Sequence, residues 1–395
     1  MPLPLYLLAM AVFAMGTSEF MLAGLLPDIA ADLGVTVGAA GTLTSAFAIG
    51  MVVGAPLMAG LARDRPGRTS LLAFVLVFSA AHVVGAATSS FAVLFAARVV
   101  AAFANAGFLA VAMTTAAALV PSDRKGRALA VLLSGTTAAT VAGVPGGALL
   151  GALLGWRATF WTVAALCLPA AIGVLTGIPR PARGDGAGPS LRGELACLRR
   201  PRLVLVMGLG ALVNAATFAG FTFLGPVVTG TAGLGDLWVP AALALFGAGS
   251  FAGVTVAGRL SDRRPGAVIA AGGPLLLVGW PALAVLAGHP AALLVLVFVQ
   301  GALSFGVGST LIARVLYEAA GAPAMGGAYA TAALNVGAAA GPVIAAATLG
   351  GGSGNLGPLW TSGALVAAAL LVALPARRVF APVRRTAPPR EHEPA

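Results

Sequence analysis

Two ionisable residues stand inside long apolar runs of the sequence. Glu19 lies within the run 3–26, and Arg98 lies within the run 91–117. Burying either charge in hydrocarbon costs about 3 kcal/mol or more, so each residue is a candidate for a functional site. A carboxyl that moves between an apolar environment and contact with a guanidinium changes its proton affinity, so the pair could bind and release a proton. The alternative is a purely structural ion pair.

The positions of the two residues along their runs allow them to meet. Each lies seven residues from the same predicted membrane surface, which is about 10 Å deep for a helix. Asn105 follows Arg98 by seven residues, on the same helix face and nearer the membrane midplane. It is a candidate for the lining of a central cavity, and the alternative is an interhelical hydrogen bond.

The composition identifies the elements that must position these residues. The chain has 395 residues, 59% hydrophobic and 9% charged, with a mean hydropathy of +0.98. Soluble domains contain about 25% charged residues, and disordered chains are poor in apolar ones, so both classes are excluded. The long unbroken runs also argue against a transmembrane β-barrel. We predict an all-α integral membrane protein with twelve transmembrane helices, at 3–26, 38–61, 69–87, 91–117, 128–154, 158–178, 203–229, 238–260, 266–287, 291–313, 325–349 and 357–376.

The order of the runs predicts two six-helix bundles, at 1–178 and 203–376. A basic cytoplasmic linker at 179–202 joins them, and a disordered cytoplasmic tail follows at 377–395. With both termini in the cytoplasm, 21 of the 23 basic residues fall in cytoplasmic segments. We therefore predict an N-in/C-in orientation, because Lys and Arg are unfavourable to translocate. The net charge of +11 then reflects membrane topology rather than a nucleic-acid-binding surface.

The two halves repeat with a common offset of 198 residues. Asp64 and Asp262 occupy matching positions in basic loops after the second and eighth runs, and Phe20 matches Phe218. An internal duplication implies two similar bundles with a site between them near the midplane. Topology requires basic loops but not the aspartates, which could cap a helix and latch one conformation. The alternative is that these loops only anchor the orientation. The candidate gating residues are Gly60, Asp64, Arg65, Gly67, Arg68, Asp262 and Arg263.

Signatures of catalysis and of cofactor binding are missing from the sequence. The single lysine, Lys125, follows Arg124, so the chain has no P-loop. The three histidines are scattered, and we expect His82 to be a residue at the end of a span. The two cysteines have no metal-ligand spacing. We therefore expect no enzyme activity, no cofactor, no metal and no nucleic-acid partner.

Glycines recur at every fourth position of the fifth run, at 143, 147, 151 and 155, and again at 337 and 341 in the eleventh run. Stripes of small residues let helices approach closely. The stripes therefore predict either close static packing or a moving, water-tight interface.

These features together resemble the major facilitator superfamily over nearly the whole chain. The loop from Gly60 to Arg68 is similar to the signature loop of that superfamily between spans 2 and 3, and Gly258 to Gly266 is similar to its second-half copy. Arg98 stands at the arginine of the span 4 motif, which the family ties to proton coupling. The span 5 segment resembles an antiporter motif, with an extra residue between Gly143 and Pro145; its residues are Gly135, Gly143, Pro145, Gly146 and Gly147.

The first run and its outer loop, from Gly16 to Gly34, are similar to twelve-span drug:proton antiporters. Together with Arg98 to Phe108 and Gly155 to Phe160, they most resemble actinobacterial chloramphenicol-efflux proteins. The resemblance implies a monomer in the bacterial inner membrane that exports a small drug in exchange for protons. The runner-up is an exporter of a sugar or another small metabolite with the same fold, and a membrane-embedded enzyme or receptor is the alternative from another class.

Within that resemblance, Glu19 and Arg98 are the predicted proton-coupling residues, because Glu19 is the acidic residue that we place within a span. Aromatic and amide side chains in the spans are the candidates for the lining of the substrate cavity: Asn105, Phe108, Asn214 and Asn335.

Overall fold

The computed structural model describes residues 2–62, 65–120, 131–132, 134–136, 138–178, 196–261, 265–319, 326–349, 352 and 354–374. Within these residues, twelve helices are long and apolar enough to cross a membrane. They confirm the twelve predicted spans and the all-α fold. The helices that form the spans are α1 (Leu3–Phe20), α3 (Val37–Ala62), α4 (Gly67–Ala87), α5 (Phe91–Ala118), α7 (Val144–Leu154), α8 (Trp156–Gly177), α10 (Pro201–Thr222), α12 (Trp238–Ser261), α13 (Pro265–Leu286), α14 (Pro290–Glu318), α15 (Gly326–Ala346) and α16 (Gly357–Ala373). The short α7 is the last part of the fifth span, Ser134–Leu154.

Short elements connect the spans or complete them. They are η1 (Met21–Gly24), α2 (Leu26–Leu33), η3 (Ala139–Gly143), η4 (Ala196–Arg199), α11 (Leu224–Pro226), η5 (Val227–Thr231) and η6 (Gly354–Leu356). Among them, α2 is an amphipathic helix that ends at Gly34, whose φ of 64° is left-handed and suits glycine.

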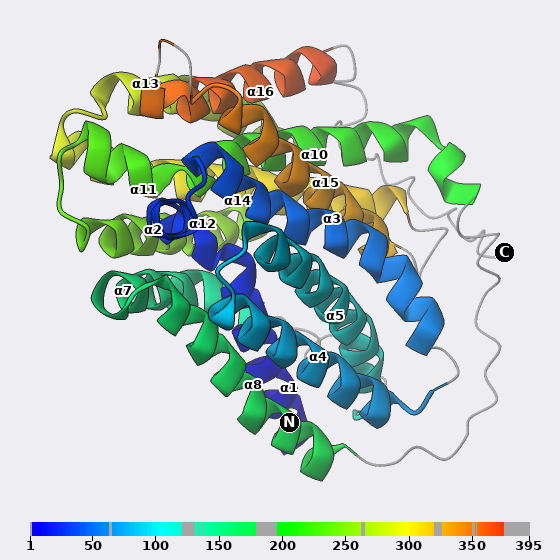
Figure 1. Ribbon diagram of the computed structural model, residues 1–395. Coiled ribbons are helices and arrows are strands. Elements are labelled where there is room, and N and C mark those ends of the chain that lie inside the picture. The colour runs from blue at the N-terminus through cyan, green and yellow to red at the C-terminus, as the bar shows by residue number, and fades with distance from the viewer. Residues whose placement is uncertain are drawn as a thin grey trace, which may run out of the picture.

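The helices of each half pack mainly on one another (Figure 1). In the first half α4 and α3 pack against α5, and α8 packs against both α1 and α4. In the second half α12 packs against α14, α10 against α15, and α13 against α14 and α16. The two halves meet along two seams, where α3 contacts α15 and α7 contacts α12. The structure is therefore two related bundles joined side by side.

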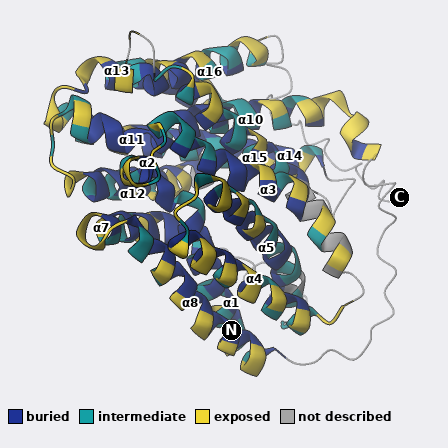
Figure 2. Cartoon of the chain, viewed as in Figure 1, coloured by how far each residue is buried: buried dark blue, intermediate teal, exposed yellow. Residues whose placement is uncertain are grey.

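The outer faces of the helices are exposed (Figure 2). Many of the exposed side chains are large and apolar. Leu154, Val285 and Leu371 are each more than two-thirds exposed, at 70%, 69% and 68%. Soluble monomers rarely present extended apolar surface of this kind. The exposed faces are those expected of helices that contact lipid.

The fifth span contains a wide turn that its second-half counterpart lacks. In the π-helical turn η3 the backbone N–H of Val144 donates to the carbonyl of Ala139. In α15 the corresponding glycine and proline, Gly341 and Pro342, are adjacent and the helix stays regular. A π-turn accommodates one extra residue in a helix. We attribute η3 to the additional residue between Gly143 and Pro145.

Glycines set the closest helix crossings in the second half. A Cβ added at Gly253 of α12 would collide with the backbone carbonyl of Ala302 in α14. A Cβ added at Gly208 of α10 would meet nothing within 4 Å. Both glycines lie in membrane-spanning helices, but Gly253 is crowded by a neighbouring backbone and Gly208 faces open space.

We predict that Gly253→Ala destabilises the folded protein by roughly 1–3 kcal/mol, because backbone atoms at the crossing have little room to move. Gly208→Ala is the matched control and is expected to be neutral or slightly stabilising, because alanine is the better helix former. Thermal unfolding of the purified proteins in detergent measures both. Equal melting temperatures for the two variants would contradict the assignment of Gly253 to a backbone-limited crossing.

Candidate functional site

Arg98 is a fully enclosed cation in the first half. Its side chain, seven residues after the start of α5, is 1% exposed, and its Cζ lies 4.3 Å from the centre of the Phe47 ring in α3. Its Nη1 donates to Ser18 Oγ of α1 at 2.7 Å. Its Nε and Nη2 have no hydrogen-bond partner. A buried guanidinium with two donor nitrogens still available can receive an anion.

His82 belongs to the same cluster, and it lies five residues before the end of α4, near the end of the span as expected. It lies in α4, is 1% exposed, and its Nε2 is 2.6 Å from Ser18 Oγ. Its Nδ1 is 2.8 Å from the carbonyl oxygen of Phe78. The sequence did not indicate its burial, because burial depends on which helix face packs inward, and α4 turns this face toward Ser18 of α1 and Phe160 of α8.

Glu19 follows Ser18 directly in α1 and is partly exposed, unlike Arg98. The two charges are close enough to interact electrostatically. They do not form a hydrogen-bonded ion pair in this conformation, because the one engaged nitrogen of Arg98 contacts Ser18. The structure therefore brings the two predicted proton-coupling residues near each other without joining them.

The seam between the halves passes beside Glu19. Phe20 of α1 and Phe218 of α10 lie with ring centres 5.8 Å apart, at positions related by the offset of 198 residues. Ala48 of α3 and Ala338 of α15 pack in the same small apolar cluster. One residue after the candidate proton carrier, α1 thus contacts the other half of the protein.

The predicted cavity residues lie in several environments. Asn105 is 2% exposed and Phe108 lies wholly within the core of the first half. Asn214 donates through Nδ2 to the carbonyl of Leu334 at 2.7 Å and so ties α10 to α15. Asn335 donates to Thr331 of its own helix. In this conformation Phe108 is a packing residue, and the amide of Asn214 is occupied by an interhelical bond.

The glycine stripe of the fifth span faces its own half. A Cβ on Gly143 would collide with Thr17 of α1, and one on Gly151 with Leu25. One on Gly135 would meet the backbone of α1. In this conformation the stripe allows close packing within the first half. This arrangement corresponds to the alternative of close static packing rather than to a moving interface between the halves. The contact with the second half is made beside it, where a Cβ on Gly247 would lie 2.7 Å from the carbonyl of Thr140 in η3.

Of the candidate gating residues, Asp64, Asp262 and Arg263 lie outside the described residues. Gly60 lies in α3, Arg65 is exposed in the following loop, and Gly67 begins α4, with Arg68 after it. Their predicted role as a latch stays a prediction.

Arg157, the basic residue placed outside by the predicted orientation, is held by its neighbours. It forms an ion pair with Asp32 of α2 and donates through Nη2 to the carbonyl of Thr88 at 3.0 Å. The indole of Trp156 donates to the same Asp32 carboxylate at 3.3 Å. This cluster fixes α2 to the start of α8.

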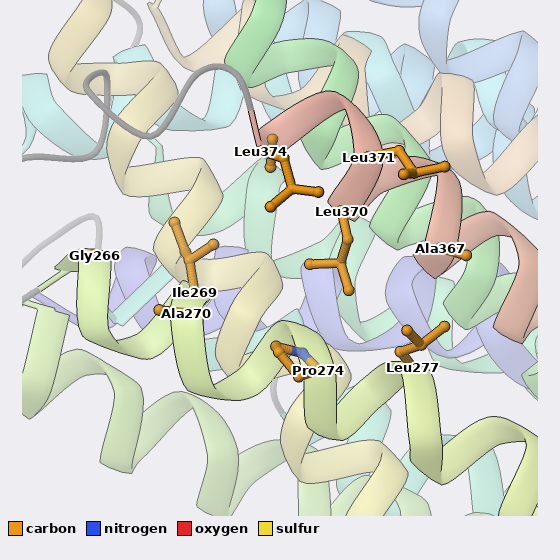
Figure 3. A pocket seen from close by; sticks show the side chains of 10 residues that line it. Gly266, Ile269, Ala270, Pro274, Leu277, Ala367, Leu370, Leu371 and Leu374 are labelled. Carbon is orange, nitrogen blue, oxygen red and sulfur yellow. The ribbon is translucent and has the colours of Figure 1, made fainter.

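An apolar groove of about 720 Å³ lies between α13 and α16 (Figure 3). Ile269, Pro274, Leu277, Leu370 and Leu374 are among its lining residues. A second groove of about 410 Å³ follows the seam of α3 and α15. Sites for drug-sized molecules combine apolar walls with a few convergent polar groups. Both grooves are lined by apolar residues, so neither is assigned as the substrate site.

Twelve membrane-spanning helices in a duplicated arrangement, with one enclosed charge cluster, define a multi-pass membrane transporter. In the described part of the chain, no group of three or more His, Cys, Asp or Glu residues could hold a metal ion. The chain belongs to the Major Facilitator Superfamily, whose family profile matches residues 8–332. This confirms the family predicted from the sequence motifs, and the chain is a transporter rather than an enzyme.

Comparison with known proteins identifies close and distant relatives. The chain is 76% identical to the chloramphenicol resistance protein of Streptomyces lividans, over 96% of this chain and 97% of that one. It is 33% identical to the inner membrane transport protein YdhP of Escherichia coli K12, over 95% and 96% of the two chains.

Solved structures share the fold. A bacterial homologue of the human lysosomal transporter Spinster, in an inward-facing and unoccupied conformation, matches with a TM-score of 0.74 and 17% identity. That alignment covers 96% of this chain and 97% of the homologue. The nucleoside transporter NupG matches with a TM-score of 0.72 and 14% identity, over 96% of this chain and 100% of that one.

At the end of the bundle that holds α2, two carboxylates of like charge approach each other. The helix α2 carries Asp28 and packs against α11 of the second half (Figure 1). Partial burial raises the pKa of Asp28, and the negative charge of Asp236 raises it further. Protonation of Asp28 is thus favoured in this conformation relative to an isolated side chain, and the conformation loses stability as the pH rises through that pKa.

We predict that Asp28→Asn makes the folded protein less sensitive to a pH increase from about 4 to 7, because the substituted amide cannot ionise. Melting temperatures across this range measure the slope. Asp32→Asn is the contrasting control and should lower the melting temperature, because it removes the ion pair with Arg157. An unchanged slope for Asp28→Asn would contradict the repulsion between Asp28 and Asp236.

Proposed function

We propose that the chain exports chloramphenicol from bacterial cells in exchange for inward-moving protons, by alternating access of two six-helix bundles. The observation that carries this proposal is the 76% identity, over nearly the full length of both chains, to a chloramphenicol resistance protein. The protein acts as a monomer with both termini in the cytoplasm. The sequence supports this orientation through its 21 basic residues in predicted cytoplasmic segments.

Glu19 is the proton carrier and Arg98 is its electrostatic switch. When Glu19 is exposed to the more acidic exterior, it takes up a proton and separates from Arg98. When it is brought to the two available nitrogens of Arg98, the carboxylate is favoured and the proton leaves. The partial exposure of Glu19 and the available Nε and Nη2 of Arg98 support this sequence of events.

The substrate occupies the space between the halves near Glu19, where the pair Phe20 and Phe218 lies at the seam, and Asn105 is a further candidate for its contacts. Gly60, Asp64 and their second-half counterparts control opening at the cytoplasmic side. Export of a sugar or a small metabolite is the competing activity for the same fold. Uptake assays in everted vesicles, with chloramphenicol and labelled sugars in parallel, separate the two.

We predict that Glu19→Gln abolishes uphill chloramphenicol export and drug-driven proton movement, while downhill drug exchange survives. The physical reason is that an amide cannot carry the proton. The measurement uses proteoliposomes with an imposed pH gradient, in which drug and proton fluxes are followed together. Glu318→Gln, at the end of α14 in the other half, is the matched control and should transport like the parent. Uphill drug accumulation by the Glu19→Gln protein would refute the carrier role.

We predict that Arg98→Lys lowers the rate of coupled export roughly 5- to 30-fold, the equivalent of about 1–2 kcal/mol. Lysine lacks the planar fork that stacks on Phe47, bonds Ser18 and keeps two further donors available. Export rates at acidic and alkaline external pH measure the effect. Parental rates at both pH values would mean that the site needs only a positive charge.

A further inference from the structure

The buried His82 has no role in the proton cycle described above, although it contacts the hydroxyl that binds Arg98. Its ring lies between two phenylalanine rings, with centres 4.3 Å from Phe78 and 5.6 Å from Phe160. A neutral aromatic side chain would fill this place equally well. Ring packing alone therefore does not explain why a residue with two polar ring nitrogens occupies this position.

The hydrogen bonds around His82 have one consistent direction. Arg98 has only donors, so Ser18 Oγ must accept from Nη1. The single hydrogen of the Ser18 hydroxyl is then free to point at His82 Nε2, 2.6 Å away. Nε2 accepts it, so Nδ1 carries the ring proton and donates to the carbonyl of Phe78. The chain of bonds thus runs from Arg98 through Ser18 and His82 to Phe78.

This chain of bonds controls where the Ser18 hydroxyl points. Hydroxyls within helices commonly donate to the carbonyl four residues earlier, and the adjacent Thr17 does so, to Phe13 at 2.8 Å. Ser18 donates to His82 instead, which leaves its oxygen facing Arg98. Without the Nε2 acceptor, the Ser18 hydroxyl would turn to its own helix as Thr17 does.

The second half shows that the helix crossing does not need this histidine. At the offset of 198 residues, Trp280 stands where His82 does. The other three positions, those of Ser18, Glu19 and Arg98, are filled by Ala216, Thr217 and Leu296. Trp280 is also buried, at 2% exposure, and its indole Nε1 lies 3.2 Å from the side-chain amide of Gln300, whose oxygen accepts from it when the amide is turned to face the indole. Histidine therefore occurs in the half that has arginine at position 98, whereas the half with tryptophan has Leu296 at the matching position.

We propose that His82 is a positioning residue for proton coupling. By accepting from Ser18, it keeps the Ser18 oxygen on Nη1 of Arg98, so that Nε and Nη2 remain turned toward the approaching Glu19 carboxylate. The role requires His82 to stay neutral, because a protonated ring would place a second donor against a hydroxyl that already accepts from Arg98. The charged group that acts on the ring is Arg98, and Glu19 in turn acts on Arg98. This inference rests on the proposed proton exchange.

The two ring nitrogens can be tested separately with a matched pair of variants. In His82→Gln the side-chain oxygen can reach the place of Nε2 and accept from Ser18. In His82→Asn the shorter amide can reach the place of Nδ1 and donate to Phe78, but leaves Ser18 without an acceptor. Ser18→Ala removes the link from the other side. The readout is the number of protons moved per chloramphenicol molecule in proteoliposomes, with melting temperature as the measure of folding.

We expect His82→Gln to keep most of the drug-driven proton movement, and His82→Asn and Ser18→Ala to lose most of it while still exchanging drug downhill. The double variant His82→Asn/Ser18→Ala should be no worse than either single variant, because both break the same chain of bonds. Should His82→Asn fail to fold, Ser18→Ala alone decides the question.

Parental coupling in His82→Asn or in Ser18→Ala would overturn the positioning role, and so would equal losses in His82→Asn and His82→Gln. Those outcomes leave the carrier role of Glu19 intact, provided that Glu19→Gln is uncoupled. If Glu19→Gln instead accumulates drug uphill, the proposed proton exchange itself fails, and the two failures are thereby distinguished.

Discussion

The enclosed charge of Arg98 is the constraint on which the site depends. No bulk water reaches a side chain that is 1% exposed in a membrane-spanning helix, so every group that stabilises it must come from the protein. The first half supplies a ring face from Phe47 and one oxygen from Ser18. That is less than a guanidinium with five N–H donors can use, and the shortfall leaves Arg98 able to respond to a carboxylate.

The duplicated scaffold carries this chemistry in one copy only. Both halves bring helices together through small residues, as at Gly50 against Ala102 in the first half and Gly253 against Ala302 in the second. The helix packing is therefore repeated, while the polar residues are not. Packing fixes the positions of the helices, and substitutions within that fixed frame decide which half carries the cluster around Arg98. The second half buries a cation at a different position, Arg314 of α14, at 8% exposure.

The sequence predicted the spans, the repeat and the pair Glu19 and Arg98, because hydropathy is a property of whole segments and a charge inside an apolar run is conspicuous. The cluster around Arg98 was harder to predict. Ser18 is a small polar residue of a kind that spans tolerate, and the burial of His82 depends on how α4 is rotated toward α1. The extra residue between Gly143 and Pro145 could have indicated the π-turn η3. The contact of η3 with Gly247 could not be predicted, because it depends on how the second half packs against the first.

Three consecutive residues of α1 connect the charge site to the seam between the halves. Ser18 bonds Arg98 and faces His82, Glu19 is partly exposed beside them, and Phe20 packs on Phe218 of the second half. Successive residues of a helix project about 100° apart, so one short segment can contact three different partners. A change in the position of Glu19 relative to Arg98 therefore acts on a backbone segment that also bears the contact between the halves. In the proposed proton exchange, coupling between the proton and the conformation needs no long pathway, because both events involve one turn of one helix.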